Sequence, residues 1–316
     1  MKLGNTEIEI SPIILGTWQA GKNMWVGIND SDSIKTIRAS IDAGVSTIDT
    51  AAIYGDGHSE TIIGKAIDGI PREKIQILTK VFPTDLAYQA VITSCENSLR
   101  RLKTDHVELL QIHWPSGTYG SAVVPIEETL KAFVRLQNEG KIRAIGVSNF
   151  SEEQIAEAQR YAPIASNQPP YSLFWPQSEQ YAIRYSQQEN ISSLAYSALA
   201  QGLLTGKFGA DHQFEKADNR STNVLVRPEH FAHVQTAITQ LTDYARAKNI
   251  SLPHLALAWV TSQDNCAAIA GARNQEQALA NAAALTVTFN KSEILELNEI
   301  AKTVTEHLDA NPVQWR

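Results

Sequence analysis

Four polar residues that could support acid–base chemistry lie at or just after the ends of apolar segments: Asp49, Tyr54, Lys80 and His113. A charge at the end of a buried strand is costly unless it is paired, so we expect Asp49 and Lys80 to be neighbours. A lysine ammonium beside a tyrosine favours the phenolate and lowers the pKa of that hydroxyl, which suits a general acid or base. His113 could donate a hydrogen bond to a substrate carbonyl. The simpler alternative is a structural Asp–Lys ion pair with two unrelated polar residues.

Eight short apolar segments alternate with helix-like segments and would position these residues. Strands are expected at 13–18, 45–51, 75–81, 107–114, 142–149, 164–168, 191–198 and 267–272. These segments are too apolar for half-exposed strands, which favours a buried parallel sheet. Eight strand–helix units without a composition break predict one α/β domain over residues 1–316, a (β/α)8 TIM barrel. In such a barrel the strand ends that carry the polar residues converge on one face.

The helices are expected at 31–43, 88–102, 126–139, 151–160, 178–189, 253–262 and 275–283. Their ends carry recognisable signals: residues 30–32 can cap the first helix, Gly44 suits a left-handed end, and Ser151 with Gln154 forms a capping-box pattern. Residues 2–10 predict an N-terminal β-hairpin that closes the bottom of the barrel. Two extra helices, at 229–248 and 291–307, fall outside the repeat.

The segment between the seventh strand and the first of these extra helices is long and irregular. It covers residues 201–227, and a loop of that length inside a compact domain is usually functional. It leaves the barrel on the face where barrel active sites lie. Residues 209–230 suggest no definite role.

The composition narrows the partners that the chain can bind. Its 316 residues include 27 Lys and Arg against 34 Asp and Glu, which gives a formal net charge of −7. Phosphate backbones require a basic surface, so no nucleic-acid or anionic-membrane partner is expected. No apolar run approaches the ~18 residues of a membrane span. We therefore expect a soluble cytoplasmic protein, monomeric or weakly oligomeric, that binds small molecules.

Several other patterns lack the residues that a ligand would need. Residues 16–23 nearly match a phosphate-binding loop but lack its Ser or Thr, and no G-x-G-x-x-G motif is present. His230 and His233 have no apparent third ligand, so no metal site is expected. Cys95 and Cys266 belong to no CxxC pair, and we expect both to be buried thiols.

Seven segments together resemble the aldo-keto reductase superfamily, in order and over essentially the whole chain. They are IDTAAIYGDGHSE (48–60), LTK (78–80), QIHW (111–114), GKIRAIGVSNF (140–150), NQPPYS (167–172), AYSALAQGLLTGKF (195–208) and GARNQEQALAN (271–281). The chain is most similar to the bacterial general-stress and aldehyde-reductase branch. The resemblance implies a barrel that reduces aldehydes or ketones to alcohols with NADPH as the cofactor.

The resemblance also implies roles for individual residues. Tyr54 matches the proton donor, and Asp49, Lys80 and His113 match the other members of a catalytic tetrad. Ser148, Asn149 and Gln168 match the residues that hold the nicotinamide carboxamide, and Tyr196 matches the aromatic ring that stacks on the nicotinamide. The remaining cofactor contacts are expected at Thr17, Trp18, Ser197, Leu199, Gln201, Gly202, Leu203, Lys207, Gly271, Arg273, Gln277 and Asn281.

Two of these expectations concern specificity. Arg273 matches the position that binds the adenosine 2′-phosphate, so the resemblance favours NADPH over NADH; a guanidinium near a helix N-terminus suits a phosphate. Trp18, Trp25, Phe82 and Trp114 would line an aromatic substrate pocket, which permits a broad range of carbonyl compounds.

Other functions remain open at this point. The enzyme could oxidise a sugar or polyol with NADP+, because hydride transfer is reversible. The superfamily also contains cofactor-binding regulatory subunits. A barrel lyase or aldolase that uses Lys80 as a Schiff base is the third alternative.

Overall fold

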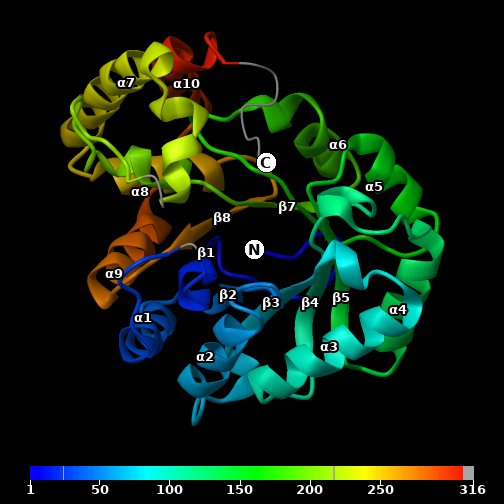
Figure 1. Cartoon of the computed structure of the whole chain (residues 1–316). Helices are drawn as coiled ribbons and strands as arrows, with labels where there is room; N and C mark the ends of the chain where they lie inside the picture. Colours follow the sequence, from blue (N-terminus) through cyan, green and yellow to red (C-terminus); the bar gives the residue numbers. More distant parts are fainter. Residues whose placement is uncertain (24, 216–217, 309–316) are drawn as a thin grey trace.

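Eight parallel strands close into a barrel in the computed structural model, which describes residues 1–23, 25–215 and 218–308. The strands follow one another in sequence order, and the last pairs with the first (Figure 1). They are β1 (Ile13–Gly16), β2 (Thr47–Asp49), β3 (Gln76–Val81), β4 (Val107–Ile112), β5 (Ile142–Ser148), β6 (Ser166–Gln168), β7 (Ser192–Ala195) and β8 (Cys266–Gly271). The predicted (β/α)8 barrel is confirmed, with a strand inside or overlapping each predicted segment.

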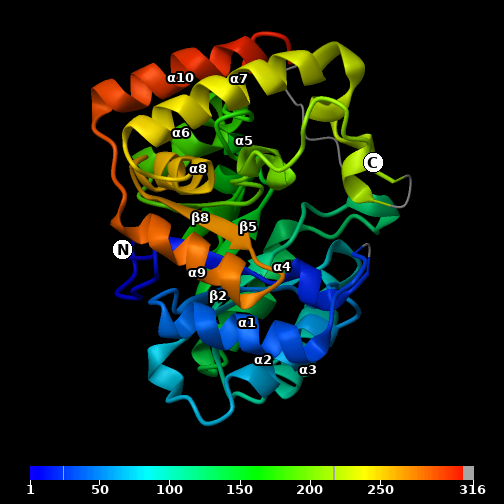
Figure 2. The ribbon, with the colours of Figure 1, turned by 90° about the vertical axis from the view of Figure 1, so that its left-hand side faces the viewer.

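Helices surround the barrel on its outside (Figure 1). Those of the strand–helix repeat are α1 (Asp30–Asp42), α2 (His58–Ala66), α3 (Tyr88–Leu102), α4 (Ile126–Asn138), α5 (Glu152–Gln159), α6 (Ala182–Gln188), α8 (Leu252–Thr261) and α9 (Gln275–Ala283). The two predicted extra helices are α7 (Pro228–Ala247) and α10 (Lys291–Thr305), which pack side by side against each other (Figure 2). No helix of the described residues is long and apolar enough to cross a membrane.

Two of the predicted capping signals are present at the helix ends, and the predicted cap of the first helix is shifted by one residue. The hydroxyl of Ser151 accepts from the amide of Gln154, and the Gln154 side chain accepts from the Ser151 amide, so the predicted capping box is present. Gly44 has the expected left-handed backbone, with φ +92°. The cap of α1 is Asn29, one residue before the predicted cluster; its side chain accepts from the amides of Ser31 and Asp32.

Three other boundaries differ from the sequence-based expectation. Helix α2 was not predicted, because its first turn lies inside the polar motif that ends at Glu60. The predicted helix 178–189 is split at Tyr181 into a short 3-10 turn and α6. Strand β1 ends at Gly16, and Trp18 begins a 3-10 turn.

Side chains alternate along each strand between the barrel interior and the surrounding helices. On β3, Leu78 and Lys80 face the interior, opposite Leu109 and Gln111 of β4. Leu78 and Leu109 are fully buried there, in an apolar layer beneath the polar strand ends.

The N-terminal hairpin extends this apolar layer at the other end of the barrel. Lys2 and Glu9 form an antiparallel bridge, and the amide of Leu3 donates to the Ile8 carbonyl at 2.8 Å. Leu3 and Ile10 belong to the same buried cluster as the interior side chains of the strands. The hairpin therefore closes the bottom of the barrel and leaves the opposite face for the polar residues.

Candidate active site

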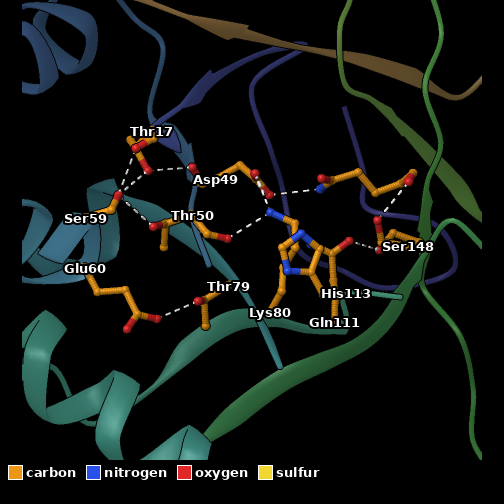
Figure 3. A network of polar contacts seen from close by, with 12 residues as sticks. Thr17, Asp49, Thr50, Ser59, Glu60, Thr79, Lys80, Gln111, His113 and Ser148 are labelled. Atoms are coloured by element: carbon orange, nitrogen blue, oxygen red, sulfur yellow. Dashed lines mark hydrogen bonds and ion pairs between the residues drawn. The ribbon is translucent and has the colours of Figure 1, made fainter. Parts of the chain in front are cut away.

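A buried ion pair lies at the carboxyl ends of β2 and β3. The Lys80 ammonium donates to Asp49 Oδ1 at 2.6 Å and to the Thr50 carbonyl at 2.8 Å (Figure 3). The Lys80 side chain is 0% exposed and that of Asp49 is 4% exposed. Because removing two charges from water is costly, charges buried this deeply are stable only when they are paired and make further hydrogen bonds. The predicted Asp49–Lys80 neighbourhood is thus present in the structure.

Tyr54 and His113 complete a compact group around this pair. The Lys80 ammonium lies 5.2 Å from the centroid of the Tyr54 ring, and the Tyr54 and His113 rings meet edge to face with centroids 5.7 Å apart. Burial lowers the pKa of His113 well below its usual value, and the Lys80 charge lowers it further, so its imidazole is neutral. Four residues from three separate segments therefore meet at one point.

The net shift of the Tyr54 pKa is opposite to the expected one. Burial raises the pKa of Tyr54 well above 10, and the Asp49 charge raises it further. The ammonium is hydrogen-bonded to Asp49 and lies over the face of the phenol ring. Tyr54 consequently keeps its proton at neutral pH.

The backbone around Asp49 is held by a chain of hydroxyl groups. Thr17 donates to the Asp49 carbonyl at 2.9 Å, and Ser59 of α2 donates to Thr17 at 2.9 Å (Figure 3). Ser59 also lies 3.0 Å from the Thr50 hydroxyl. Thr17, predicted as a cofactor contact, is buried and fixes the end of β2 in this structure.

The four residues expected around the nicotinamide lie together beside the ion pair. The Gln168 side-chain amide donates to Asp49 Oδ2 at 2.9 Å, and the Gln168 backbone carbonyl accepts from the Ser148 hydroxyl at 2.9 Å. Asn149 has a left-handed backbone, with φ +61°. Its amide donates to the His113 carbonyl at 3.1 Å, and its Oδ1 accepts from the Tyr196 hydroxyl at 2.8 Å. One network therefore links these residues to the candidate tetrad.

Aromatic side chains gather above Tyr54 and His113. The Trp18 ring centroid lies 6.3 Å from that of Tyr54, and the Phe82 centroid lies 5.7 Å from that of His113. Sequence analysis missed Tyr119, whose ring contacts both Phe82 and Trp114 with centroids 5.5 Å and 5.3 Å away. Tyr119 lies in a short irregular turn, between Thr118 and Gly120, and has φ +54°, so no periodicity points to it.

Trp25 connects the aromatic group to the predicted phosphate-binding residue. Its ring meets Trp18 edge to face with centroids 5.2 Å apart, and the Arg273 guanidinium lies 5.0 Å from the Trp25 ring centroid. The structure therefore places Trp25 between the expected substrate pocket and the expected cofactor site.

The turn after β7 has an unusual backbone. Ser197, Ala200, Gln201 and Gly202 all have positive φ values, from +47° to +98°. Successive amides in such turns can form an anion-binding concavity. The other residues predicted here lie on the same turn or just beyond it: Leu199, Leu203, which is buried, and Lys207, which is exposed.

The N-terminus of α9 brings the last group of predicted residues together. The backbone amide of Arg273 donates to the Gln277 side chain at 3.0 Å, and Asn281 donates to the Gly271 carbonyl at 3.1 Å. A Cβ on Gly271 would lie 2.3 Å from the side-chain amide of Gln19, so that side chain would have to move to admit one. Burial lowers the pKa of Arg273, and the nearby charge of Arg220 lowers it further.

Arg220 lies in the loop to which sequence analysis gave no role; residues 216–217 of that loop lie outside the described part of the chain. Its guanidinium lies 4.8 Å from the centroid of the Phe214 ring and 5.2 Å from that of Phe208, and it is ion-paired with Asp218 at 2.5 Å. Asn223 of the same loop donates to Gln201 at 2.8 Å. The loop therefore connects the turn after β7 with the neighbourhood of Arg273.

Within the described residues, no cluster of three or more His, Cys, Asp or Glu side chains could hold a metal ion. The two cysteines are buried and free, as expected, and burial raises the pKa of each thiol to about 12.

Comparisons with known proteins agree with this geometry. The family model described as "Aldo/keto reductase family" matches residues 12–302. Aldo-keto reductase YhdN of Bacillus subtilis is 37% identical, over 98% of this chain and 95% of the relative. An Escherichia coli relative named NADH-specific methylglyoxal reductase is 30% identical, over 96% of this chain and 98% of the relative.

Solved structures show the same fold over the whole barrel. The glycerol dehydrogenase AKR11B4 from Gluconobacter oxydans has a TM-score of 0.88 and 32% identity, covering 100% of this chain and 97% of that one. An aldo-keto reductase from Klebsiella pneumoniae in complex with NADPH has a TM-score of 0.77 and 30% identity, covering 97% of this chain and 95% of that one.

Proposed function

The chain belongs to the aldo/keto reductase family and is an oxidoreductase that uses a nicotinamide cofactor, and we propose that it reduces aldehydes or ketones to alcohols with NADPH. One observation carries the proposal: a protonated phenol and a neutral imidazole meet beside a buried Lys80–Asp49 pair, beneath aromatic side chains. Such a group can bind a carbonyl and protonate it.

The four polar residues have separate roles in this proposal. The substrate oxygen accepts a hydrogen bond from His113, whose neutral imidazole can donate without adding a charge to the pocket. Tyr54 donates its proton to the developing alkoxide, a step worth ~10²- to 10⁴-fold in typical enzymes. Lys80 supplies positive charge next to the phenol, and Asp49 holds Lys80 in place. NADPH, when bound, supplies the hydride.

The raised pKa of Tyr54 suits its proposed role as the proton donor in the reduction. A proton donor must carry its proton at the start of the step, and burial together with Asp49 keeps the phenol protonated.

The chain's own residues fit a phosphorylated dinucleotide. The left-handed turn at residues 197–202 suits a pyrophosphate, and the Arg273 and Arg220 guanidiniums suit a 2′-phosphate at the start of α9. Ser148, Asn149 and Gln168 offer amide and hydroxyl groups beside the tetrad, as a carboxamide requires.

Substitution of Tyr54→Phe tests the proposal. The variant keeps the ring and loses the proton, so turnover of an aromatic aldehyde should fall by ~10²- to 10⁴-fold. NADPH affinity, measured by tryptophan fluorescence, should change little, because the hydroxyl is not a proposed cofactor contact. Turnover close to that of the wild type would show that Tyr54 is not the proton donor.

A further inference from the structure

A second buried carboxylate lies close to the candidate tetrad. Glu60, in the first turn of α2, has a side chain with 0% exposure. Its Oε1 accepts from the Thr79 hydroxyl at 2.7 Å (Figure 3). Its Oε2 accepts from Arg101 of α3 at 2.6 Å and 2.7 Å. Burying a carboxylate is costly even when it is paired, and a pair of apolar residues often gives a more stable protein.

The position of Glu60 connects it to Lys80. Thr79 directly precedes Lys80 on β3, so its side chain faces the helices while that of Lys80 faces the barrel interior. The hydrogen bond from Thr79 to Glu60 therefore fixes the strand on its outer side at the point where the inner side carries the ammonium. Ser59, the neighbour of Glu60, fixes β1 and β2 in the same way through Thr17 and Thr50.

The charges around these groups are few and can be named. Lys80 is faced by Asp49 from β2, by Tyr54 from the following loop and by His113, which directly follows β4. Burial lowers the pKa of Lys80, and the carboxylates of Asp49 and Glu60 both oppose that effect.

Two groups from α3 face Glu60. Arg101 is ion-paired with it, and Cys95 stays a neutral thiol, since burial is the main cause that raises the Cys95 pKa to about 12. The Glu60 carboxylate is therefore the charge on this side of β3 that favours the ammonium, and Arg101 partly neutralises it.

We propose that Glu60 is a positioning residue for the carbonyl reduction: its carboxylate, set by Arg101, acts across β3 to keep Lys80 protonated and in place beside Tyr54. The proposal rests on the proposed function, because Lys80 must assist Tyr54 for Glu60 to matter. Nothing in it requires Glu60 to touch substrate or cofactor.

Two neutral variants, Glu60→Gln and Arg101→Met, should change the pH profile of reduction in opposite directions. Activity falls at high pH when the coupled Tyr54–Lys80 pair loses its proton. Glu60→Gln removes a negative charge, so the midpoint of this alkaline limb should move down by roughly 0.5 to 1 pH unit. Arg101→Met leaves Glu60 without its neutralising partner, so the midpoint should move up. The measurement is kcat and kcat/KM against pH with saturating NADPH.

A purely structural role predicts a different result. Loss of either Glu60 or Arg101 would then lower the melting temperature. The alkaline midpoints of the two variants would stay at the wild-type value or move in the same direction, and either of these results would overturn the proposal. The double variant removes both charges, and we expect its midpoint between those of the single variants. If Glu60→Gln does not fold, the direction of the Arg101→Met shift alone decides.

A matched ion pair at the opposite end of the barrel provides the control. Arg72 contacts Glu108 at 2.8 Å, and the Glu108 side chain is also largely buried. Glu108→Gln should lower stability and leave the alkaline midpoint unchanged; a shift equal to that of Glu60→Gln would overturn the proposal. Tyr54→Phe distinguishes failure of the proposed function from failure of the Glu60 proposal. If Tyr54→Phe keeps full activity, the proposed function fails. If activity depends on Tyr54 but the alkaline midpoints of the Glu60 and Arg101 variants match that of the wild type, only the role of Glu60 is refuted.

Discussion

At the scale of single residues, the buried imidazole of His113 should make the protein less stable in mild acid. Burial, followed by the Lys80 charge, lowers its pKa well below 6.5, whereas the unfolded chain titrates near that value. The stability that neutral His113 contributes is therefore present above about pH 6.5 and is lost as the pH falls towards the folded pKa. The loss is at most about 1.4 kcal/mol for each pH unit below the unfolded pKa.

The variant His113→Gln isolates this contribution. Its amide does not titrate, so its unfolding free energy should fall less than that of the wild type over the same pH range, in matched denaturant titrations. Parallel pH dependences for the two proteins would mean that His113 is not held in its neutral form.

Some of the site residues could be predicted from the sequence, and others could not. Asp49, Lys80 and His113 could be found because each is a polar residue at the end of an apolar run, where strands of a barrel converge. Tyr119 and Arg220 could not, because irregular loops carry them and only the folded chain brings them to the site. The pKa of Tyr54 was predicted in the wrong direction, since sequence shows neither its burial nor the way Asp49 binds Lys80.

At the scale of elements, two loops that carry the site pass unusually close to each other. Gly55, which follows Tyr54, has φ +64°, and a Cβ on it would lie 2.1 Å from the Gly21 carbonyl oxygen. Gly21 ends the 3-10 turn that begins at Trp18. The loops cannot both keep their places if either gains a side chain, because the contact is between backbones.

The substitution Gly55→Ala should therefore lower both stability and kcat. Strain at positive φ and the clash act together, and displacement of the loop moves the Tyr54 hydroxyl; a misplacement of about 1 Å can cost ~10²-fold in rate. Gly69→Ala is the matched control, because Gly69 has φ +82° with no atom within 4 Å of its Cβ position. The control should lose some stability by strain and keep its kcat. Equal kcat values in the two variants would contradict the close-approach argument.

Element boundaries were harder to predict than the elements themselves. Each of the eight strands lies in or overlaps a segment predicted from its apolar character, because both faces of a parallel barrel strand are buried; β6 is the exception in composition, since Ser166–Gln168 are all polar. Helix α2 was not predicted, because its first turn carries Ser59 and Glu60, two polar residues whose side chains face inward and hydrogen-bond to Thr17 and Thr79 at the strand ends. The polar character that hides this helix in the sequence is the same feature that lets it position the site.

At the scale of the whole molecule, an acidic protein places two arginines at its proposed phosphate site, one of which is ion-paired with Asp218. The formal net charge is −7, yet Arg273 and Arg220 lie close enough for one to lower the pKa of the other. Two neighbouring guanidiniums repel each other, and a bound phosphate dianion removes that repulsion.

NADPH binding should consequently weaken with salt more steeply than NADH binding. The two cofactors differ only in the 2′-phosphate, and salt screens its attraction to the guanidiniums, since the Debye length is about 10 Å at 0.1 M ionic strength. From low salt to about 0.3 M, the ratio of NADPH to NADH affinity should fall roughly 3- to 10-fold. Fluorescence titrations with both cofactors measure the ratio directly. Arg273→Gln should lower the ratio at low salt and flatten its salt dependence; a wild-type protein that binds both cofactors equally at every salt concentration would show that Arg273 does not clamp a 2′-phosphate.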